Sequence, residues 1–328
     1  MRISVLIPVY NGIPYIAQAI ESVLAQECQD WELVISDNGS KDGTRDYLRT
    51  LSDPRIRVYE QPSNLGIMGN LNFLLTQAQA PIAKILGHDD MLLSGGLERT
   101  AQFMEERPDC AVSRCWAQGD KIRYSKRGIL RWENQLPSKL EPAAAILAFA
   151  TFGNFVGNIC RAACRPKLVL QEGGFDLKYP SAGDYEGWHR VARTFGIWLQ
   201  NEELVFERIH KMQDSCVLTQ TNQIDPQVNS ILEIISKEVD PLLLQILKRH
   251  WTIHVFSPRF SRFARQVFSG RFSLASSIWR NLPLGVSGIS SVAAYPIFKL
   301  KLPQYNSTTS YLLAEIIKRN KNNLEPID

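Results

Sequence analysis

The first half of the sequence alternates unbroken apolar runs with segments of helical spacing, and this alternation constrains the fold most strongly. The run ISVLIPV at residues 3–9 is almost wholly apolar, as expected for a strand buried on both faces of a parallel sheet. Further strands are predicted at residues 31–37, 55–60, 82–86 and 110–117, of which 55–60 is edge-like, and segments with helical spacing separate them. The sequence therefore predicts a doubly wound α/β fold with a mostly parallel, Rossmann-like sheet flanked by helices.

The second half of the sequence changes character after about residue 220. Up to that point we predict helices at residues 44–51 and 94–107, with Thr44 and Ser94 as N-caps, and two short strands at residues 197–200 and 203–210. Beyond it, helical patterns dominate and are interrupted by Pro, Gly and Ser at residues 283–296. We therefore expect an α/β domain over residues 1–219 and a helical C-terminal extension over residues 220–328.

The helical extension is also the basic part of the chain. Residues 220–328 hold 13 Lys and Arg against 7 Asp and Glu, whereas the whole protein has a net charge of only +4. Around residues 257–282, arginines alternate with Phe, Val, Leu, Ile and Trp. Such a segment could lie on an anionic membrane surface. It could equally be a helix that packs on the preceding domain with its arginines in water.

Cysteine usage and the start of the sequence favour a reducing compartment. None of the six cysteines forms a Cys-x-x-Cys pair, and no histidine has zinc-site spacing relative to them. The opening residues MRISVLIPVYNG lack a signal-peptide pattern, and polar residues interrupt the uncharged runs at 142–160 and 281–298. We expect a cytoplasmic protein, with peripheral association with the inner face of the plasma membrane as a further option.

Polar clusters follow three of the predicted strands. They are Tyr10-Asn11, Asp37-Asn38 and His88-Asp89-Asp90. In a doubly wound sheet, ligands bind outside the carboxyl ends of the strands, so these clusters can converge in space. The adjacent carboxylates of Asp89 and Asp90 repel each other unless a cation or water compensates, and Mg²⁺ or Mn²⁺ shared with substrate phosphates would do so. A helix-capping Asp beside a solvated Asp is the alternative.

Three further polar residues have both a functional and a structural interpretation. Asp37 could accept hydrogen bonds from a nucleotide base or ribose, although Asp-Asn-Gly-Ser is also ordinary turn chemistry. Asp184 begins a predicted helix, where it could act as a general base or simply interact with the helix dipole. His210 follows an apolar strand and could bind Mn²⁺ or be a packed surface residue.

Taken together, the motifs resemble those of the family-2 glycosyltransferases, which have the GT-A fold. The likeness lies in SVLIPVYNG, DNGSKDGT, NLGIMGNLN, LGHDDML, GGFD, GDYEGW and ERIHKMQDS, which occur in the family's order over residues 3–217. The resemblance implies that Asp184 is the catalytic base. It implies that Asp89, Asp90 and His210 bind a divalent metal, Mn²⁺ or Mg²⁺. It implies a donor-binding set of Pro8, Tyr10, Asn11, Asp37, Asn64, Gly66, Asn72 and His88.

Two departures from the family's pattern bear on this interpretation. Gly87 replaces the first Asp of the family's Asp-x-Asp motif, and Gly183 stands before the base where the family often has Glu. The Gln-x-x-Arg-Trp motif of processive members is absent from the stretch around Trp188, so we expect one sugar to be added per encounter.

The implied activity is an inverting transfer from a nucleotide-diphosphate sugar, by default a UDP- or dTDP-sugar. The acceptor would be a saccharide or lipid-linked saccharide in lipopolysaccharide, O-antigen, capsule or exopolysaccharide synthesis, and no nucleic acid partner is expected. A sugar-nucleotide nucleotidyltransferase is one alternative, but PVYNGIPYI lacks the basic residue that would hold a triphosphate. A non-catalytic nucleotide-sugar-binding module is the other alternative, and the replacement of the first Asp of the motif by Gly87 is compatible with it.

Overall fold

The computed structural model describes residues 1–118, 135–208, 210, 223–280 and 304–322. The chain forms two compact units, one of residues Met1–Ala145 and Asn154–Ile209, the other of Ile146–Gly153 and His210–Asp328. The boundary predicted between residues 219 and 220 lies outside the described residues and stays a prediction.

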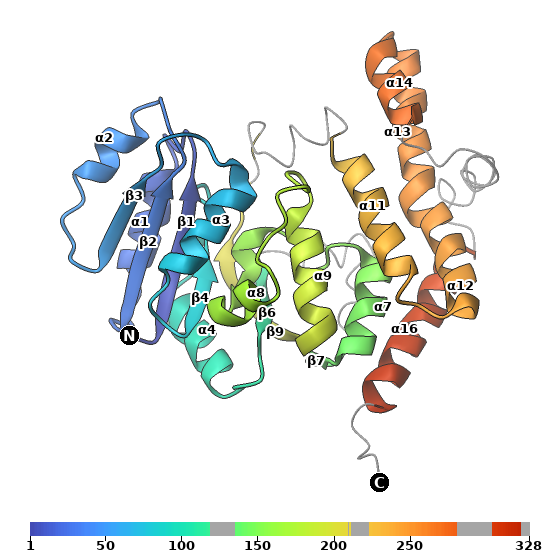
Figure 1. The fold of residues 1–328 in the computed structure, drawn as a ribbon, viewed down its shortest axis with the longest axis horizontal. Coiled ribbons are helices and arrows are strands. Elements are labelled where there is room, and N and C mark those ends of the chain that lie inside the picture. The colour runs from blue at the N-terminus through green and yellow to red at the C-terminus, as the bar shows by residue number, and fades with distance from the viewer. Residues whose placement is uncertain (119–134, 209, 211–222, 281–303, 323–328) are drawn as a thin grey trace. The chain divides into compact units, whose positions relative to one another are not determined.

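The first unit is built on one sheet with the order β3-β2-β1-β4-β8-β6-β9-β5 among the described residues, and β7 pairs with β9. Its strands are β1 (Ile3–Val9), β2 (Trp31–Asp37), β3 (Ile56–Glu60), β4 (Ile82–Ile85), β5 (Met91–Leu92), β6 (Val112–Ala117), β7 (Lys139–Leu140), β8 (Ala162–Cys164) and β9 (Ile197–Phe206). Helices flank this sheet (Figure 1), which confirms the predicted α/β class.

The two central strands explain why the polar clusters meet. All seven residues of β1 and of β2 are buried, as the apolar runs predict. The strands are parallel and in register, with Val9 opposite Asp37, and β4 lies on the other side of β1 with Leu6 opposite Ile85. The chain therefore leaves β1 and β2 at the same edge of the sheet, where the loops that carry polar residues begin.

The far half of the sheet is mixed rather than parallel. The short strand β8 lies antiparallel between β4 and β6, and neither β8 nor β5 was predicted, since runs of two or three residues carry no periodic signal. The two strands expected at residues 197–200 and 203–210 are one continuous strand, β9, which ends at Phe206 and pairs with β6 on both sides of a shift in register.

The helices of the first unit are α1 (Ile16–Leu24), α2 (Thr44–Arg49), α3 (Gly66–Gln77), α4 (Gly96–Glu105), α8 (Pro166–Gln171) and α9 (Gly183–Phe195), with a 3₁₀ turn at Ile159–Arg161. The predicted N-caps Thr44 and Ser94 are wrong. Gly43 and Gly95, both left-handed, precede these two helices. Thr44 instead accepts the Gly12 N–H and donates to Asp42, so its hydroxyl connects loops rather than capping its helix.

The second unit is helical, as predicted for the C-terminal extension. It contains α11 (Ile224–Ser236), α12 (Pro241–Trp251), a π-helical turn (Thr252–Phe256), α13 (Ser257–Phe268), α14 (Phe272–Arg280) and α16 (Gln304–Asn322). The helix α7 (Pro142–Phe152) runs from the first unit into the second. Within the described ranges, every helix is too short or too polar to cross a lipid bilayer.

Candidate functional site

The loops after β1 and β2 are bonded into one structure. The Asn11 N–H donates to Ser40 Oγ over 2.8 Å, and Asn11 Oδ1 accepts the Lys41 N–H over 2.9 Å. Asn11 holds this position in the left-handed region, with φ of 52°, which Asn tolerates better than most residues. The loop that carries Asn11 and the loop that follows Asp37 therefore support each other.

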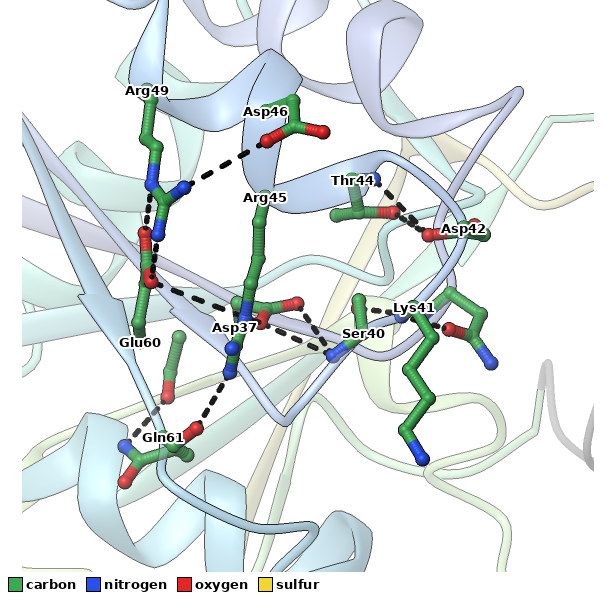
Figure 2. A network of polar contacts seen from close by, with 12 residues as sticks. Asp37, Ser40, Lys41, Asp42, Thr44, Arg45, Asp46, Arg49, Glu60 and Gln61 are labelled. Atoms are coloured by element: carbon green, nitrogen blue, oxygen red, sulfur yellow. Dashed lines mark hydrogen bonds and ion pairs between the residues drawn. The ribbon is translucent and has the colours of Figure 1, made fainter.

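The carboxylate of Asp37 is fully buried and already paired (Figure 2). Arg45 Nε donates to Asp37 Oδ2 over 2.6 Å, and the Ser40 N–H lies 3.2 Å from the same oxygen. A terminal nitrogen of Arg45 also donates to the Gln61 carbonyl over 2.7 Å. Arg45 compensates the buried charge and fixes the carboxylate. Sequence analysis missed Arg45 because a helical Arg eight residues from an Asp gives no pairing signal.

Next to this network lies the turn that begins α3. Asn38 Nδ2 donates to Asn64 Oδ1 over 2.9 Å, and Asn38 Oδ1 accepts the Leu65 N–H over 2.8 Å. Asn64 Oδ1 also accepts the Gly66 N–H over 2.8 Å, and Gly66 is left-handed with φ of 72°. Asn64 and Gly66 thus share a side-chain network with the end of β2. Asn38, which was not among the predicted site residues, connects the two.

The helix α3 connects this network to the loop before α9. Asn72 makes a two-way bond with Phe175: its Oδ1 accepts the Phe175 N–H over 2.7 Å, and its Nδ2 donates to the Phe175 carbonyl over 2.8 Å. One turn earlier, Met68 lies so close to Gly183 that a Cβ on residue 183 would be 2.8 Å from its Cγ and Sδ. A side chain at residue 183 would therefore require Met68 to move.

At the start of α9, Asp184 is half-buried and its charge is held by two donors. Asn154 Nδ2 donates to its Oδ2 over 2.8 Å, and the Tyr185 N–H donates to its Oδ1 over 2.9 Å. Burial raises the pKa of Asp184 to about 6, and these two hydrogen bonds oppose the rise. A carboxylate with a pKa near the working pH is suited to take a proton from an attacking hydroxyl. Sequence analysis did not single out Asn154.

The cluster His88-Asp89-Asp90 lies on the loop after β4 and contacts the loop after β1. A Cβ on Gly12 would lie 3.2 Å from His88 Cδ2, so the imidazole packs directly on that loop. A Cβ on Gly87 would lie 2.9 Å from Asp89 Oδ1 and 2.6 Å from Asp90 Oδ2. The two carboxylate oxygens therefore flank one point that the glycine leaves open. We call this point the Gly87 cradle.

The second carboxylate of the cradle is anchored from the segment just after β9. The Arg208 N–H donates to Asp90 Oδ1 over 3.0 Å, while Arg208 Nε donates to the Asp89 carbonyl over 3.0 Å. Burial, together with the neighbouring charge of Asp89, raises the pKa of Asp90 to about 7. Arg208 was not predicted, and its position two residues before His210 gave no sign of this role.

The donor set at the cradle fits a hard divalent cation. Asp90 is buried, and its Oδ2 has no hydrogen-bond partner among the described residues, whereas Asp89 is half-exposed. The described residues contain no group of three or more His, Cys, Asp or Glu that could hold a metal. Two carboxylate oxygens with the remaining ligands from water and phosphate is a common arrangement for Mg²⁺. A bound cation would also offset the repulsion between Asp89 and Asp90.

Comparison with known proteins agrees with this geometry. The model of the family described as Glycosyl transferase family 2 matches residues 4–160, from β1 to the 3₁₀ turn before β8. These residues, just under half of the chain, carry a glycosyl transferase family 2 domain.

Relatives of the chain carry glycosyltransferase names. An uncharacterized glycosyltransferase of Rickettsia felis is 25% identical over 228 residues, which is 67% of this chain but only 36% of that protein. TuaG of Bacillus subtilis, named as a candidate glycosyltransferase of teichuronic acid biosynthesis, is 39% identical over 113 residues, 34% of this chain and 44% of TuaG. The chain thus matches about a third of the length of the Rickettsia felis relative.

Two solved structures show the same fold. Staphylococcus aureus TarS 1–349 in complex with UDP-GlcNAc has a TM-score of 0.62 at 15% identity, over 98% of this chain and 93% of that one. The mannosyltransferase PcManGT of Pyrobaculum calidifontis, in complex with GDP-Man and Mn²⁺, has a TM-score of 0.59 at 17% identity, over 99% and 88%. At these identities the likeness establishes the fold.

The structure brings most of the predicted site residues together. Those at or beside the edge formed by β1, β2 and β4 are Pro8, Tyr10, Asn11, Asp37, Asn64, Gly66, His88, Asp89 and Asp90. Asn72 and Asp184 are reached through α3. His210 belongs to the second unit, and its assignment as a metal ligand stays a prediction.

Proposed function

We propose that this chain transfers one sugar from a nucleoside-diphosphate sugar to an acceptor hydroxyl, with inversion at the anomeric carbon. The observation that carries the proposal is the placement of three kinds of group on one unit. These are a paired carboxylate at the end of β2, a carboxylate cradle after β4, and a half-buried carboxylate at the start of α9. They supply, in that order, nucleoside binding, diphosphate charge compensation and a general base.

The nucleoside would be held by the loops after β1 and β2. Asn11, Asp37 and Asn64 are fixed by bonds within those loops, so little ordering would be needed when a base and ribose bind. UDP- or dTDP-sugars remain the expected donors. The complex of TarS with UDP-GlcNAc supports a uridine nucleotide. The complex of PcManGT with GDP-Man is the reason to include GDP in the binding experiment.

The diphosphate would lie at the Gly87 cradle. Asp89 and Asp90 would hold Mn²⁺ or Mg²⁺ there, with Asp90 oriented by Arg208. A cation bound at this point supplies Lewis-acid stabilisation of the negative charge on the departing nucleoside diphosphate. The Mn²⁺ in the PcManGT complex supports this assignment.

Asp184 would remove the proton from the acceptor hydroxyl as that oxygen attacks the anomeric carbon. Its pKa of about 6 leaves it mostly ionised at neutral pH, and Asn154 holds the carboxylate in place. The transition state has oxocarbenium character, as in glycoside hydrolysis, so a nearby carboxylate also stabilises it electrostatically. The acceptor would be a saccharide or lipid-linked saccharide of a bacterial surface polymer, a class that the name of TuaG supports.

Calorimetric titration with UDP, dTDP, GDP and CMP, each with and without Mn²⁺, tests the proposal. We expect metal-dependent binding of one nucleotide, lost in Asp89→Asn and retained in Asp109→Asn. The latter removes a more exposed carboxylate that pairs with Lys139. Metal-independent binding would remove Asp89 from its assigned role. Nucleotide binding without turnover of any sugar donor would favour a non-catalytic module, and turnover of a nucleoside triphosphate with a sugar phosphate would favour a nucleotidyltransferase.

A further inference from the structure

Two aromatic residues, Phe268 and Phe272, flank the turn between α13 and α14. The turn closes α13 with the bonds of a Schellman motif: the Gly270 N–H donates to the Val267 carbonyl over 3.0 Å, and the Arg271 N–H donates to the Gln266 carbonyl over 2.9 Å. Gly270 takes the required left-handed conformation, with φ of 71°. This short turn places Phe268, the last residue of α13, close along the chain to Phe272, the first of α14.

The two helices pack together without using these residues. Figure 1 shows α13 and α14 side by side, and the rings of Phe263 and Trp279 lie 5.0 Å apart between them. Ala275 and Ile278 are buried on the inner face of α14. Phe268, in contrast, is 91% exposed. The two helices therefore form an apolar contact with each other, and the aromatic residues of the turn lie outside that contact.

The turn carries more than one exposed apolar side chain. Phe272 is 67% exposed and Val267 36%, so three large apolar residues gather within six positions of the chain. Single exposed apolar residues are normal on soluble proteins, but contiguous ones usually mark an interaction surface. We call residues 265–272 the aromatic tip.

Positive charge surrounds the aromatic tip. Residues 257–280 contain five arginines and no acidic residue. Two of the arginines have a structural partner, because Arg259 and Arg262 bind the Asp225 carboxylate over 3.1 Å and 2.6 Å. Arg265 and Arg271 are exposed and flank Phe268 in the sequence. The exposed charge near the tip is therefore entirely cationic between residues 257 and 280.

We propose that the aromatic tip binds an anionic phospholipid bilayer. Phe268, Phe272 and Val267 would enter the boundary between headgroups and acyl chains, where apolar side chains leave water. Arg265 and Arg271 would stay at the level of the anionic headgroups. The aliphatic Val267 and the convex turn of the hairpin favour lipid over single-stranded nucleic acid, which binds along grooves with stacking platforms.

Flotation of the full-length chain with lipid vesicles tests this proposal. We expect binding to vesicles of phosphatidylcholine with about one third phosphatidylglycerol, weakened by salt, and little binding to phosphatidylcholine alone. The double variant Phe268→Ser with Phe272→Ser should weaken binding tenfold or more, because two apolar rings no longer leave water. The double variant Arg265→Gln with Arg271→Gln should weaken it roughly thirtyfold at low salt.

Matched controls come from the same unit. Leu242→Ser removes an apolar side chain that is 70% exposed on α12, and Lys248→Gln with Arg249→Gln removes two exposed cations from that helix. Both should leave vesicle binding unchanged. Equal losses in the control and tip variants would overturn the proposal, as would absence of binding to anionic vesicles at low salt.

Two further outcomes would assign the tip to another partner and so overturn the lipid proposal. One is a dimer, measured by light scattering, that the Phe268→Ser, Phe272→Ser variant dissociates. The other is displacement from vesicles by single-stranded oligonucleotide at matched charge. Calorimetry of UDP with Mn²⁺ on the same variants separates this inference from the proposed transfer activity. The tip variants should bind nucleotide normally, whereas failure of the donor site would leave vesicle binding intact.

Discussion

At the scale of single residues, the pKa of Asp184 predicts how the rate depends on pH. A general base must be ionised, so kcat/KM should fall as pH drops through about 6, the value to which burial raises this pKa. Asn154 donates to the ionised form. Asn154→Ala should therefore move the acid limb of the profile to higher pH, by about one unit.

The measurement is a pH profile of nucleotide release from a sugar donor with acceptor present. Asp184→Asn should lower kcat by a factor of roughly 10² to 10⁴ across the whole range. A profile that stays unchanged in Asn154→Ala would show that the acid limb belongs to another group. A role of Asn154 in folding alone would lower the amount of active enzyme without moving the limb.

Gly87 gives a second prediction at the residue scale. The methyl group of Gly87→Ala would occupy the cradle, within 3 Å of both Asp90 Oδ2 and Asp89 Oδ1. Because Arg208 holds the Asp90 carboxylate, that side chain cannot simply turn away. We expect the Mn²⁺-dependent part of nucleotide affinity to fall tenfold or more, with a loss of stability of about 1 kcal/mol.

Titrating Mn²⁺ into wild type and Gly87→Ala at fixed UDP measures this effect, with the melting temperature as the check on folding. Unchanged metal affinity in a folded variant would mean that the cation binds away from the cradle. Gly87→Asp should behave like Gly87→Ala rather than restoring the family's Asp-x-Asp motif, because its side chain starts from the same crowded Cβ position.

The site residues differ in how much of their environment comes from residues nearby in the sequence. Asp37, Asp89 and Asp184 stand out in the sequence because each ends a strand, follows one or starts a helix within a motif. Arg45 and Asn154 could not, since an ion pair or an amide–carboxylate bond between distant segments leaves no periodic signal in the chain.

At the scale of elements, α12 holds the C-terminal end of α7 through two side chains. His250 Nε2 lies 2.8 Å from the Thr151 carbonyl, and Trp251 Nε1 donates to the Ala150 carbonyl over 2.7 Å. These are among the carbonyls that a helix leaves without internal partners at its end. Since the carbonyl accepts, His250 carries a proton on Nε2 and the other ring nitrogen faces the hydroxyls of Thr308 and Thr309.

The neutral state of His250 predicts acid sensitivity of the second unit. Burial, with the neighbouring His254 ring, lowers its pKa from the usual 6.5 to about 3. Below pH 6.5 the unfolded chain binds a proton that the folded chain does not, so the free energy of unfolding falls as pH decreases from 6.5 toward 3. The loss from this group between about pH 7 and pH 4.5 should be roughly 2.5 kcal/mol.

Urea unfolding at these two pH values measures the loss. In His250→Gln the amide can still donate to the Thr151 carbonyl, so the variant should be destabilised by about 1–2 kcal/mol at neutral pH yet lose less on acidification. An identical pH dependence in the variant would show that other groups cause the acid sensitivity.

The elements that the sequence predicted best are those with a long, one-sided pattern. The buried strands β1 and β2 match their apolar runs residue for residue. The short strands β5 and β8 exist only because longer neighbours pair with them. The cap positions at Thr44 and Ser94 failed for a related reason: loop contacts and left-handed glycines decided where those helices begin.

At the scale of the whole molecule, the two units divide the proposed tasks. Except for His210, all residues assigned here to the donor, the cradle and the base lie in the first unit. The second unit carries the aromatic tip and His250. The sequence predicted a helical second part from its change of pattern, but not that residues 146–153 belong with it. An apolar helix such as α7 can join either core, and only tertiary packing decides.

Because the proposed donor site and His250 lie in different units, nucleotide binding and acidification should shift different transitions of a thermal unfolding profile. UDP with Mn²⁺ at a hundredfold excess over its Kd stabilises the state that binds it by about 2.7 kcal/mol, which should raise the melting temperature of the first unit by roughly 5 °C or more. Lowering the pH toward 5 should instead destabilise the second unit through His250.

Scanning calorimetry of wild type, Asp89→Asn and His250→Gln separates the two effects. Asp89→Asn should lose only the nucleotide shift, and His250→Gln only part of the acid shift. A single transition that both perturbations move together would show that the two units unfold as one cooperative body.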